Sequence, residues 1–281
     1  MSEYIVRRMQ REEVDLAVDW AAGEGWNPGL HDAECFWAVD PQGWWIGLLD
    51  GQPVCLKSAV AYDEAFGFMG FYITAPEYRG LGHGFELWKQ ANASLGQRTV
   101  GMDGVVAQQE NYKKSGYRYA YRQMRFQGAG GAPANASAPL VDLRDFALEQ
   151  LAAYDRRHFP AERPEFLKLW ISRPGTVALG YMEGESLAGY GVLRPCRQGY
   201  KIGPLFADTP EIAESLYNNL CASVSQQDPV FLDVPEPNPH AMALVERHQM
   251  KYVFETARMY TGTPPELPLE QIYGITSFEL G

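Results

Sequence analysis

One short stretch of the chain, residues 66–88, most restricts how it can fold. An apolar run rich in aromatic residues spans 66–75 and ends at Pro76. Three glycines follow at positions 80, 82 and 84, and a helical pattern then opens at Phe85. This order predicts a strand, a tight turn and a helix. Glycines let the backbone approach a ligand closely, and the first N–H groups of a helix lack partners within it, so the turn favours a bound anion such as pyrophosphate.

Two common phosphate-binding sequences do not fit this turn. A Walker loop has Lys and then Ser or Thr after its last glycine, where this chain has Phe85 and Glu86. A dinucleotide-binding loop has the spacing G-x-G-x-x-G, which these glycines do not provide. The pattern Arg79-x-x-Gly82-x-Gly84 resembles instead the pyrophosphate loop of the GNAT acyltransferases, which bind acetyl-coenzyme A. The resemblance implies that acetyl-CoA, a cosubstrate, is bound by Arg79, Gly80, Leu81, Gly82, His83 and Gly84.

A second pattern of the same family follows the loop. A helical run at 85–95 and a strand-like run at 104–107 precede Asn111-Tyr112-Lys113-Lys114-Ser115-Gly116-Tyr117. In GNAT enzymes the tyrosine of such a Tyr-x-x-x-Gly-aromatic pattern lies near the coenzyme sulfur. The resemblance implies that Tyr112 is the general acid that protonates the departing thiolate, with Gly116 ending its helix. It also implies that a backbone N–H near Tyr72 or Ile73 holds the acyl carbonyl.

Composition and charge limit the class of protein. The chain has 281 residues, 46% of them hydrophobic, and no apolar run of the roughly 18–20 residues that a membrane helix needs. Its first residues lack the apolar core of a signal peptide, so we expect a cytoplasmic protein without a membrane partner. The net charge of -11 argues against a nucleic-acid partner and suits a cationic small molecule such as an amine.

The cysteines and histidines show no metal or disulfide pattern. The four cysteines are scattered and form no C-x-x-C pair. The five histidines have no zinc-binding spacing. We therefore expect no metal.

The second half of the chain repeats the first at an offset of 133 residues. Gly47-Leu48-Leu49-Asp50-Gly51 corresponds to Gly180-Tyr181-Met182-Glu183-Gly184, and Gly70 corresponds to Gly203. Residues 128–139, rich in Gly, Ala and Pro, separate the two copies and indicate a linker. The predicted fold class is therefore α/β (α+β), with two tandem GNAT-like domains, each a mixed, mostly antiparallel sheet flanked by helices.

The second copy has lost the features that bind the coenzyme. Ile212-Ala213-Glu214-Ser215-Leu216-Tyr217 stands where the first copy has Arg79 to Gly84, and Val245 stands in place of Tyr112. We predict a GNAT domain with the acetyl-CoA site at 1–128, a linker at 129–139, and a degenerate GNAT-like domain without the loop at 140–281. This arrangement, with its chain end at 273–281, resembles a group of two-domain GNAT proteins.

The acceptor pocket and the general base are less well marked. In the resembled fold the first two helices and their loop build the acceptor pocket, and we place Trp26 and Asn27 there because they lie in a loop bounded by Gly and Pro. The central strand carries no carboxylate, so the base stays open. The remaining candidates, besides a water chain, are Glu24, His31, Asp32 and Glu110.

Together these patterns predict an acetyl-CoA-dependent N-acetyltransferase that acts on a primary amine of an unidentified small-molecule acceptor. A non-catalytic acyl-CoA sensor or interaction module is the alternative, since it needs the loop but no acid. A purely structural dimerisation protein would need neither the loop nor Tyr112. The second domain either offers carboxylates to the acceptor or covers an exposed sheet edge of the first, and the oligomeric state is left open.

Overall fold

The computed structural model describes residues 2–281, and the chain has two halves with the same order of elements. The first half contains β1 (Tyr4–Arg8), α1 (Arg11–Gly23), α2 (Asp32–Val39), β2 (Trp44–Leu49), β3 (Gln52–Ala61), β4 (Phe66–Thr74), α3 (His83–Ser94), β5 (Thr99–Val105), α4 (Gln109–Lys114) and β6 (Arg118–Ala129). The second half contains β7 (Leu140–Asp142), α5 (Leu148–His158), α6 (Pro164–Trp170), β8 (Val177–Glu183), β9 (Ser186–Pro195), β10 (Tyr200–Ala207), α7 (Pro210–Ala222), β11 (Pro229–Pro235), α8 (Pro239–Arg247), β12 (Lys251–Tyr260) and β13 (Ile272–Gly274).

Local conformation repeats along with the elements and confirms the duplication. The β2–β3 hairpin turns at Asp50 and Gly51 with φ of 49° and 79°, the left-handed values of a tight hairpin turn. The matching β8–β9 hairpin turns at Gly184 with φ of 62°. After α4, Gly116 has φ of 90°, and its counterpart after α8, Gln249, has φ of 50°. The second copy thus keeps the backbone shape although the glycine is gone.

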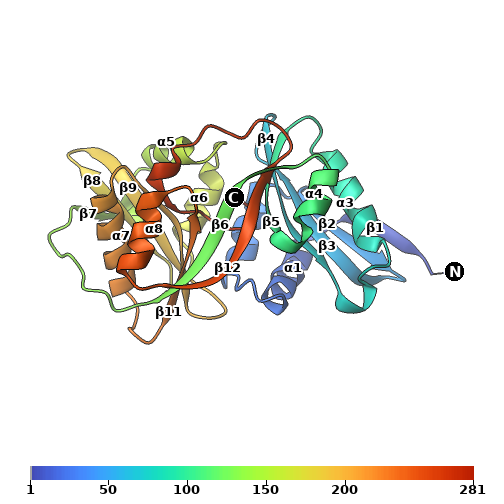
Figure 1. Ribbon diagram of the computed structural model, residues 1–281, viewed down its shortest axis with the longest axis horizontal. Helices are drawn as coiled ribbons and strands as arrows, with labels where there is room; N and C mark the ends of the chain where they lie inside the picture. The colour runs from blue at the N-terminus through green and yellow to red at the C-terminus, as the bar shows by residue number, and fades with distance from the viewer. Residues whose placement is uncertain (1) are drawn as a thin grey trace.

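All strands join one sheet, because the two halves exchange their last strands. The order is β1-β2-β3-β4-β5-β12-β6-β11-β10-β9-β8-β7, with β13 added to β10. β12 of the second half therefore pairs with β5 of the first, and β6 of the first half pairs with β11 of the second. Figure 1 shows β6 and β12 side by side through the middle of the molecule, with the C-terminus between the two halves.

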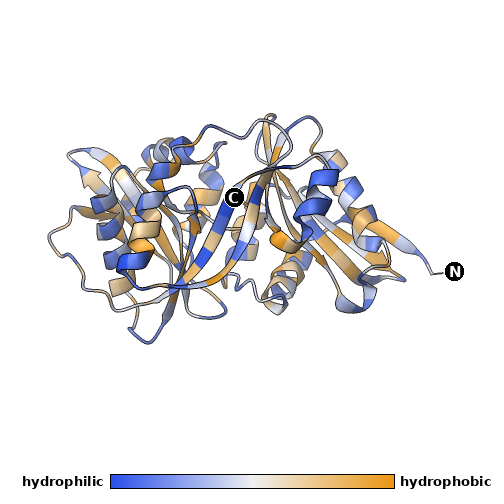
Figure 2. Cartoon of the chain, in the orientation of Figure 1, coloured by the Kyte–Doolittle hydropathy of each residue, from blue (hydrophilic) through white to orange (hydrophobic). Residues whose placement is uncertain are grey.

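The exchanged strands carry a polar seam. In Figure 2 both strands are banded blue where the flanking sheet is mostly orange. Arg258 on β12 makes two hydrogen bonds of 2.7 Å to Asp103 on β5, and Arg125 on β6 makes bonds of 2.6 and 2.7 Å to Asp233 on β11. All four side chains are buried. The two pairs occupy equivalent places in the duplication, and each ties one half to the other.

Helices cover both faces of the sheet. On one face α1, α2, α5 and α6 enclose a core shared by the two halves, in which Phe36 stacks on Trp170 at 5.9 Å between ring centroids. On the other face α3 and α4 cover the first half, with Trp88 and Tyr112 in their core. Helices α7 and α8 cover the second half.

One expected boundary is wrong. The strand expected at 104–107 is β5, Thr99–Val105, and a short 3₁₀ turn follows it. A charged residue, Asp103, lies within this strand, and the partner that neutralises it, Arg258, lies far along the chain, so the strand could not be recognised from its neighbours in sequence. β6 continues through Ala129, which pairs with Pro229.

Candidate active site

The candidate site opens where two parallel strands of the first half separate. β4 and β5 pair from Phe66–Thr99 to Met69–Met102, and beyond that point they diverge. A cavity of about 560 Å³ occupies the gap, a volume typical of small-molecule sites. It is lined from β4 by residues 69–72 and from β5 by residues 102–105.

A bulge in β4 shapes the edge of this gap. The pairing of β3 with β4 shifts between Leu56 and Ser58, so that two β4 residues, Phe71 and Tyr72, lie opposite Lys57. Phe71 has φ of 49°, a value that L-residues rarely adopt. Bulges of this kind turn backbone groups out of the hydrogen-bond ladder and are frequent beside active sites. Tyr72, beside the bulge, lines the cavity, whereas Ile73 does not, and its side chain packs in the core.

The glycine-rich loop lies at the start of α3. Gly80 and Gly82 have φ of 78° and 91°, and no atom lies within 4 Å of the place where either Cβ would stand. The backbone N–H groups of residues 80–84 donate to no acceptor within residues 2–281. The Tyr4 hydroxyl donates to the His83 carbonyl at 2.7 Å and holds the first turn in place. The loop is thus a cradle of free donors, as an anion requires.

Arg79 is paired with a residue of the cavity wall. Its Nε donates to the Thr74 carbonyl at 2.9 Å, and its Nη2 pairs with the Glu24 carboxylate. Glu24 itself lines the cavity. Of the base candidates, this carboxylate is the one that reaches the site, and Arg79 is its partner.

Tyr112 forms one wall of the cavity. Its ring stacks on Trp88 with 5.6 Å between centroids, and Gly104 leaves the space it occupies, since a Cβ there would lie 2.4 Å from the ring. Burial raises the pKa of Tyr112 to about 12. At neutral pH its hydroxyl is protonated, as that of an ordinary tyrosine would be, so it holds a proton that can be donated.

Lys57 was not identified from the sequence. It lies on β3, is 1% exposed, lines the cavity, and places Nζ 4.0 Å from the centroid of the Trp88 ring. Within residues 2–281 it has no hydrogen-bond or ion-pair partner, and burial lowers its pKa well below the usual range. The available signal was a single lysine within the apolar run 54–61.

The second half completes the cavity. β12 contributes Tyr252, Phe254 and Thr256, and the C-terminal tail contributes Phe278 and Glu279. None of these was identified from the sequence, because they reach the first half only through the exchange of strands and the path of the tail.

Of the two residues predicted for the acceptor pocket, one lines the cavity and the other does not. Trp26 lines the cavity, and its carbonyl accepts a hydrogen bond of 2.6 Å from Arg125. Asn27 does not line it: its side chain exchanges hydrogen bonds of 3.0 and 2.8 Å with the backbone of Gln198 in the second half. Asn27 therefore joins the two halves.

Three of the base candidates lie away from the cavity. Asp32 is buried and paired with Arg194 at 2.9 Å, which lowers the pKa of this carboxyl although burial opposes the shift. His31 lies beside this pair. Glu110 is exposed and pairs with Lys113 at 2.7 Å.

The second half has no counterpart of the cavity among the described residues. There β13 pairs with β10 at Leu205 and Phe206, and so fills the place that the gap occupies in the first half. Helix α7 begins after Thr209, whose side chain accepts a hydrogen bond of 3.4 Å from the N–H of Ile212. The end of this helix is capped by the chain itself.

No helix within residues 2–281 is long and apolar enough to cross a membrane. No group of three or more His, Cys, Asp or Glu side chains in that range could hold a metal ion. The four cysteines are buried and free.

Comparison with known proteins agrees with the duplication. A sequence model of the acetyltransferase (GNAT) family matches residues 9–117, and a model of an acetyltransferase (GNAT) domain matches residues 151–274. The chain is 30% identical over 270 residues to a holothin acyltransferase of Pseudoalteromonas sp. (strain SANK 73390), covering 96% of this chain and 92% of that protein.

Solved structures show the same fold. A candidate acetyltransferase of Pyrococcus horikoshii is similar with a TM-score of 0.84 and 21% identity, covering 99% of this chain and 96% of that one. A tandem GNAT protein from the clavulanic acid biosynthesis pathway is similar with a TM-score of 0.67 and 15% identity, covering 95% of this chain and all of that one. The match to both halves and the full-length relative show that the chain belongs to the GNAT acetyltransferase family, as a tandem member.

Proposed function

We propose that the protein is an N-acetyltransferase that transfers an acetyl group from acetyl-CoA to a primary amine of a small molecule. The observations that carry the proposal are the gap between β4 and β5, with Tyr112 in its wall, and the cradle of free N–H groups at the start of α3. The likeness to a holothin acyltransferase supports acyl transfer as the reaction.

The loop fits the coenzyme. The open space beside Gly80 and Gly82 gives a pyrophosphate close access to the backbone, and the unpaired N–H groups of residues 80–84 with the dipole of α3 favour its charge. Arg79 adds a cation at the same place, where Glu24 holds it in the free protein. When bound, the coenzyme supplies the acyl group as a thioester.

Each residue of the cavity then has a defined task. Backbone N–H groups at the bulge, near Tyr72 and Ile73, hold the acyl oxygen and stabilise the charge that develops on it. Tyr112 donates a proton to the departing thiolate sulfur. Trp26 and the aromatic side chains of the second half exclude water and bind the apolar part of the acceptor.

We further propose that 1–128 and 140–281 are the two duplicated domains, joined through 129–139, and that the coenzyme binds the first alone. The capping of α7 by Thr209 and the place of β13 support a single site. The exchange of β6 and β12 means that each proposed domain is completed by a strand of the other.

The reaction is tested by incubating the protein with acetyl-CoA and a panel of primary amines while free thiol is followed. Tyr112→Phe should lower the single-turnover rate about 10²-fold, within the usual range for a general acid, and should leave CoA affinity unchanged because the ring stays on Trp88. The matched control is Tyr119→Phe, which removes the hydroxyl of an exposed tyrosine. CoA binding without thiol release for any amine would support an acyl-CoA sensor instead.

A further inference from the structure

The last residues of the chain connect the two halves. After β13, the N–H of Ile275 donates to the Asp233 carbonyl at 2.9 Å. The tail then passes close to β10 of the second half and β4 of the first. A Cβ on Gly203 of β10 would lie 2.5 Å from the Thr276 carbonyl oxygen, and one on Gly70 of β4 would lie 2.2 Å from the Glu279 carbonyl oxygen. Equivalent glycines in the two halves therefore make room for one tail.

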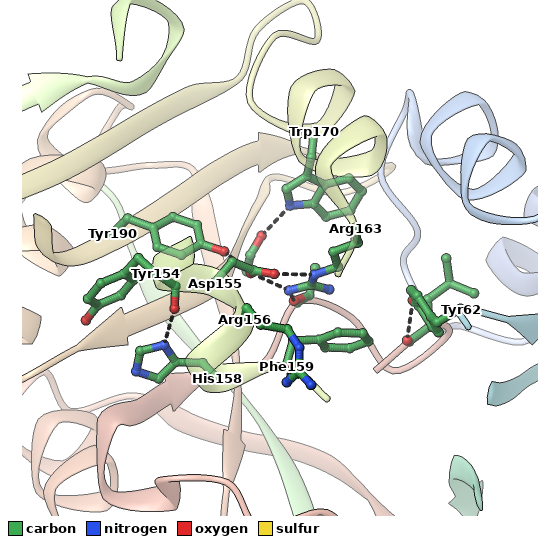
Figure 3. A network of polar contacts seen from close by, with 12 residues as sticks. Tyr62, Tyr154, Asp155, Arg156, His158, Phe159, Arg163, Trp170 and Tyr190 are labelled. Atoms are coloured by element: carbon green, nitrogen blue, oxygen red, sulfur yellow. Dashed lines mark hydrogen bonds and ion pairs between the residues drawn. The ribbon is translucent and has the colours of Figure 1, made fainter. Parts of the chain in front are cut away.

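The tail is fixed on both sides of Glu279. Arg163, which is buried and paired with Asp155, donates to the Thr276 hydroxyl at 2.9 Å. The Tyr62 hydroxyl donates to the Leu280 carbonyl at 2.8 Å. Figure 3 shows this network, with Arg163 and Asp155 at its centre and Tyr62 reaching in from the first half. Because these anchors come from both halves, the position of the tail depends on their assembly.

Glu279 is buried without a partner. It is 2% exposed and lines the cavity, yet neither carboxylate oxygen has a hydrogen-bond partner within residues 2–281. A carboxylate removed from water is costly unless a donor or a cation replaces the water. A ligand in the cavity can supply that donor.

Among residues 2–281, none of the charged side chains around Glu279 supplies the missing hydrogen-bond donor. Arg125 and Arg194 interact electrostatically with Glu279, but each is already paired with its own aspartate. Lys201 is buried, its Nζ has no hydrogen-bond partner within residues 2–281, and it forms no ion pair with Glu279. Thus the neighbouring cations influence Glu279 from a distance, and none occupies its oxygens.

Glu279 and Tyr112 both line the cavity but come from segments that pack in different cores. Tyr112 and Trp88 belong to the core beneath α3 and α4. Phe278, next to Glu279, belongs to the core beneath α1 and α2, where Phe254 and Trp26 also pack.

We propose that Glu279 binds the acceptor and is its general base, so that the acceptor is a primary amine on an apolar or aromatic body. This inference rests on the proposed function. The carboxylate accepts hydrogen bonds from the ammonium and takes its proton, and the neutral nitrogen forms the N–C bond while the C–S bond breaks. Tyr112 protonates the leaving sulfur and is reprotonated from solvent, while the second proton of the attacking nitrogen and the proton held by Glu279 both pass to solvent. The products are an amide and free CoA.

The first test needs no acceptor. Glu279→Gln keeps the shape and removes the buried charge, so the ligand-free variant should unfold at a higher urea concentration than the wild-type protein. The matched control is Glu270→Gln, an exposed glutamate near the start of the tail, which should shift the midpoint little. A lower midpoint for Glu279→Gln would mean that the carboxylate has a structural partner, and would overturn the proposal.

The second test compares acceptors. For 2-phenylethylamine, Glu279→Gln should lower kcat/KM about 10²-fold or more, with CoA affinity unchanged. For phenylhydrazine, which is largely neutral at neutral pH, the loss should be much smaller, because no base is needed to free the nitrogen. An equal loss for both would assign Glu279 a merely structural role.

The outcomes distinguish a failure of the role of Glu279 from a failure of the proposed N-acetyltransferase activity. If the wild-type protein transfers the acetyl group and Glu279→Gln does so equally fast, only the proposed role of Glu279 is contradicted. If the wild-type protein binds CoA but transfers an acetyl group to no amine, the proposed N-acetyltransferase activity itself is contradicted.

Discussion

Replacing Lys57 by methionine should stabilise the free protein. Lys57 is 1% exposed and has no ion-pair or hydrogen-bond partner within residues 2–281, so burial disfavours its charged form. The rings of Trp88 and Tyr72, at 4.0 and 4.9 Å from Nζ, offset about 2 kcal/mol of the cost of burying the charge. Methionine is unbranched, uncharged and packs well against aromatic rings, so it can fill the same space.

The pH dependence fixes the sign and size of the effect. Burial lowers the pKa of Lys57 well below its value in the unfolded chain, about 10.4. Between these two pKa values the unfolded chain holds one more proton, so the free energy of unfolding rises with pH by about 1.4 kcal/mol per pH unit. Lys57→Met removes this dependence. Its advantage over the wild-type protein should therefore shrink as the pH rises toward the pKa of a lysine in the unfolded chain, about 10.4.

Urea unfolding at a series of pH values measures this difference. The matched control is Lys89→Met, which removes a lysine with a side chain 54% exposed and reports the loss of one surface charge. A Lys57→Met variant less stable than the wild-type protein near neutral pH would refute the reasoning, because it would mean that Lys57 is charged and paired. A difference that does not change with pH would refute it equally.

Three further predictions concern the coenzyme loop and the exchanged strands. Gly82→Glu should abolish CoA binding, since it adds a side chain at φ of 91° and a like charge in the cradle; calorimetry should find one site per wild-type chain, and two sites would contradict the single-site proposal. Arg258→Met leaves Asp103 buried without its partner and should cost about 3–5 kcal/mol in urea unfolding, so a loss below about 1 kcal/mol would contradict the pairing. A fragment of residues 1–133 lacks β12, leaves the edge of β5 unpaired, and should aggregate or unfold; a soluble, fully active fragment, judged by light scattering and thiol release, would contradict the role of the second half.

Local features could be predicted from the sequence because their causes are local. The hairpin at Asp50-Gly51, the break after α4 at Gly116 and the left-handed turns of the loop each depend on a residue that tolerates positive φ. The loss of the loop in the second half could be recognised by the same reasoning, and Thr209 now caps that helix. The repeat of these signals at one offset was enough to predict two copies of one fold.

The composition of the cavity could not be predicted in the same way. Lys57 and Glu279 stand in apolar surroundings in the sequence, and nothing in their neighbours along the chain says whether a partner meets them. Asn27 and Asp32 show the opposite case, since their partners Gln198 and Arg194 lie more than 160 residues away. Whether a polar side chain is free or satisfied is a property of contacts between distant segments.

The exchange of strands was likewise decided by tertiary structure alone. β6 and β12 are copies of one ancestral strand, with the same alternation and an arginine at the same place, Arg125 and Arg258. β5 therefore finds equivalent backbone hydrogen bonds, and an equivalent partner for Asp103, in either strand. Sequence patterns specify that β5 has such a neighbour, whereas the path of the chain between the halves and the packing around the tail decide that the neighbour is β12.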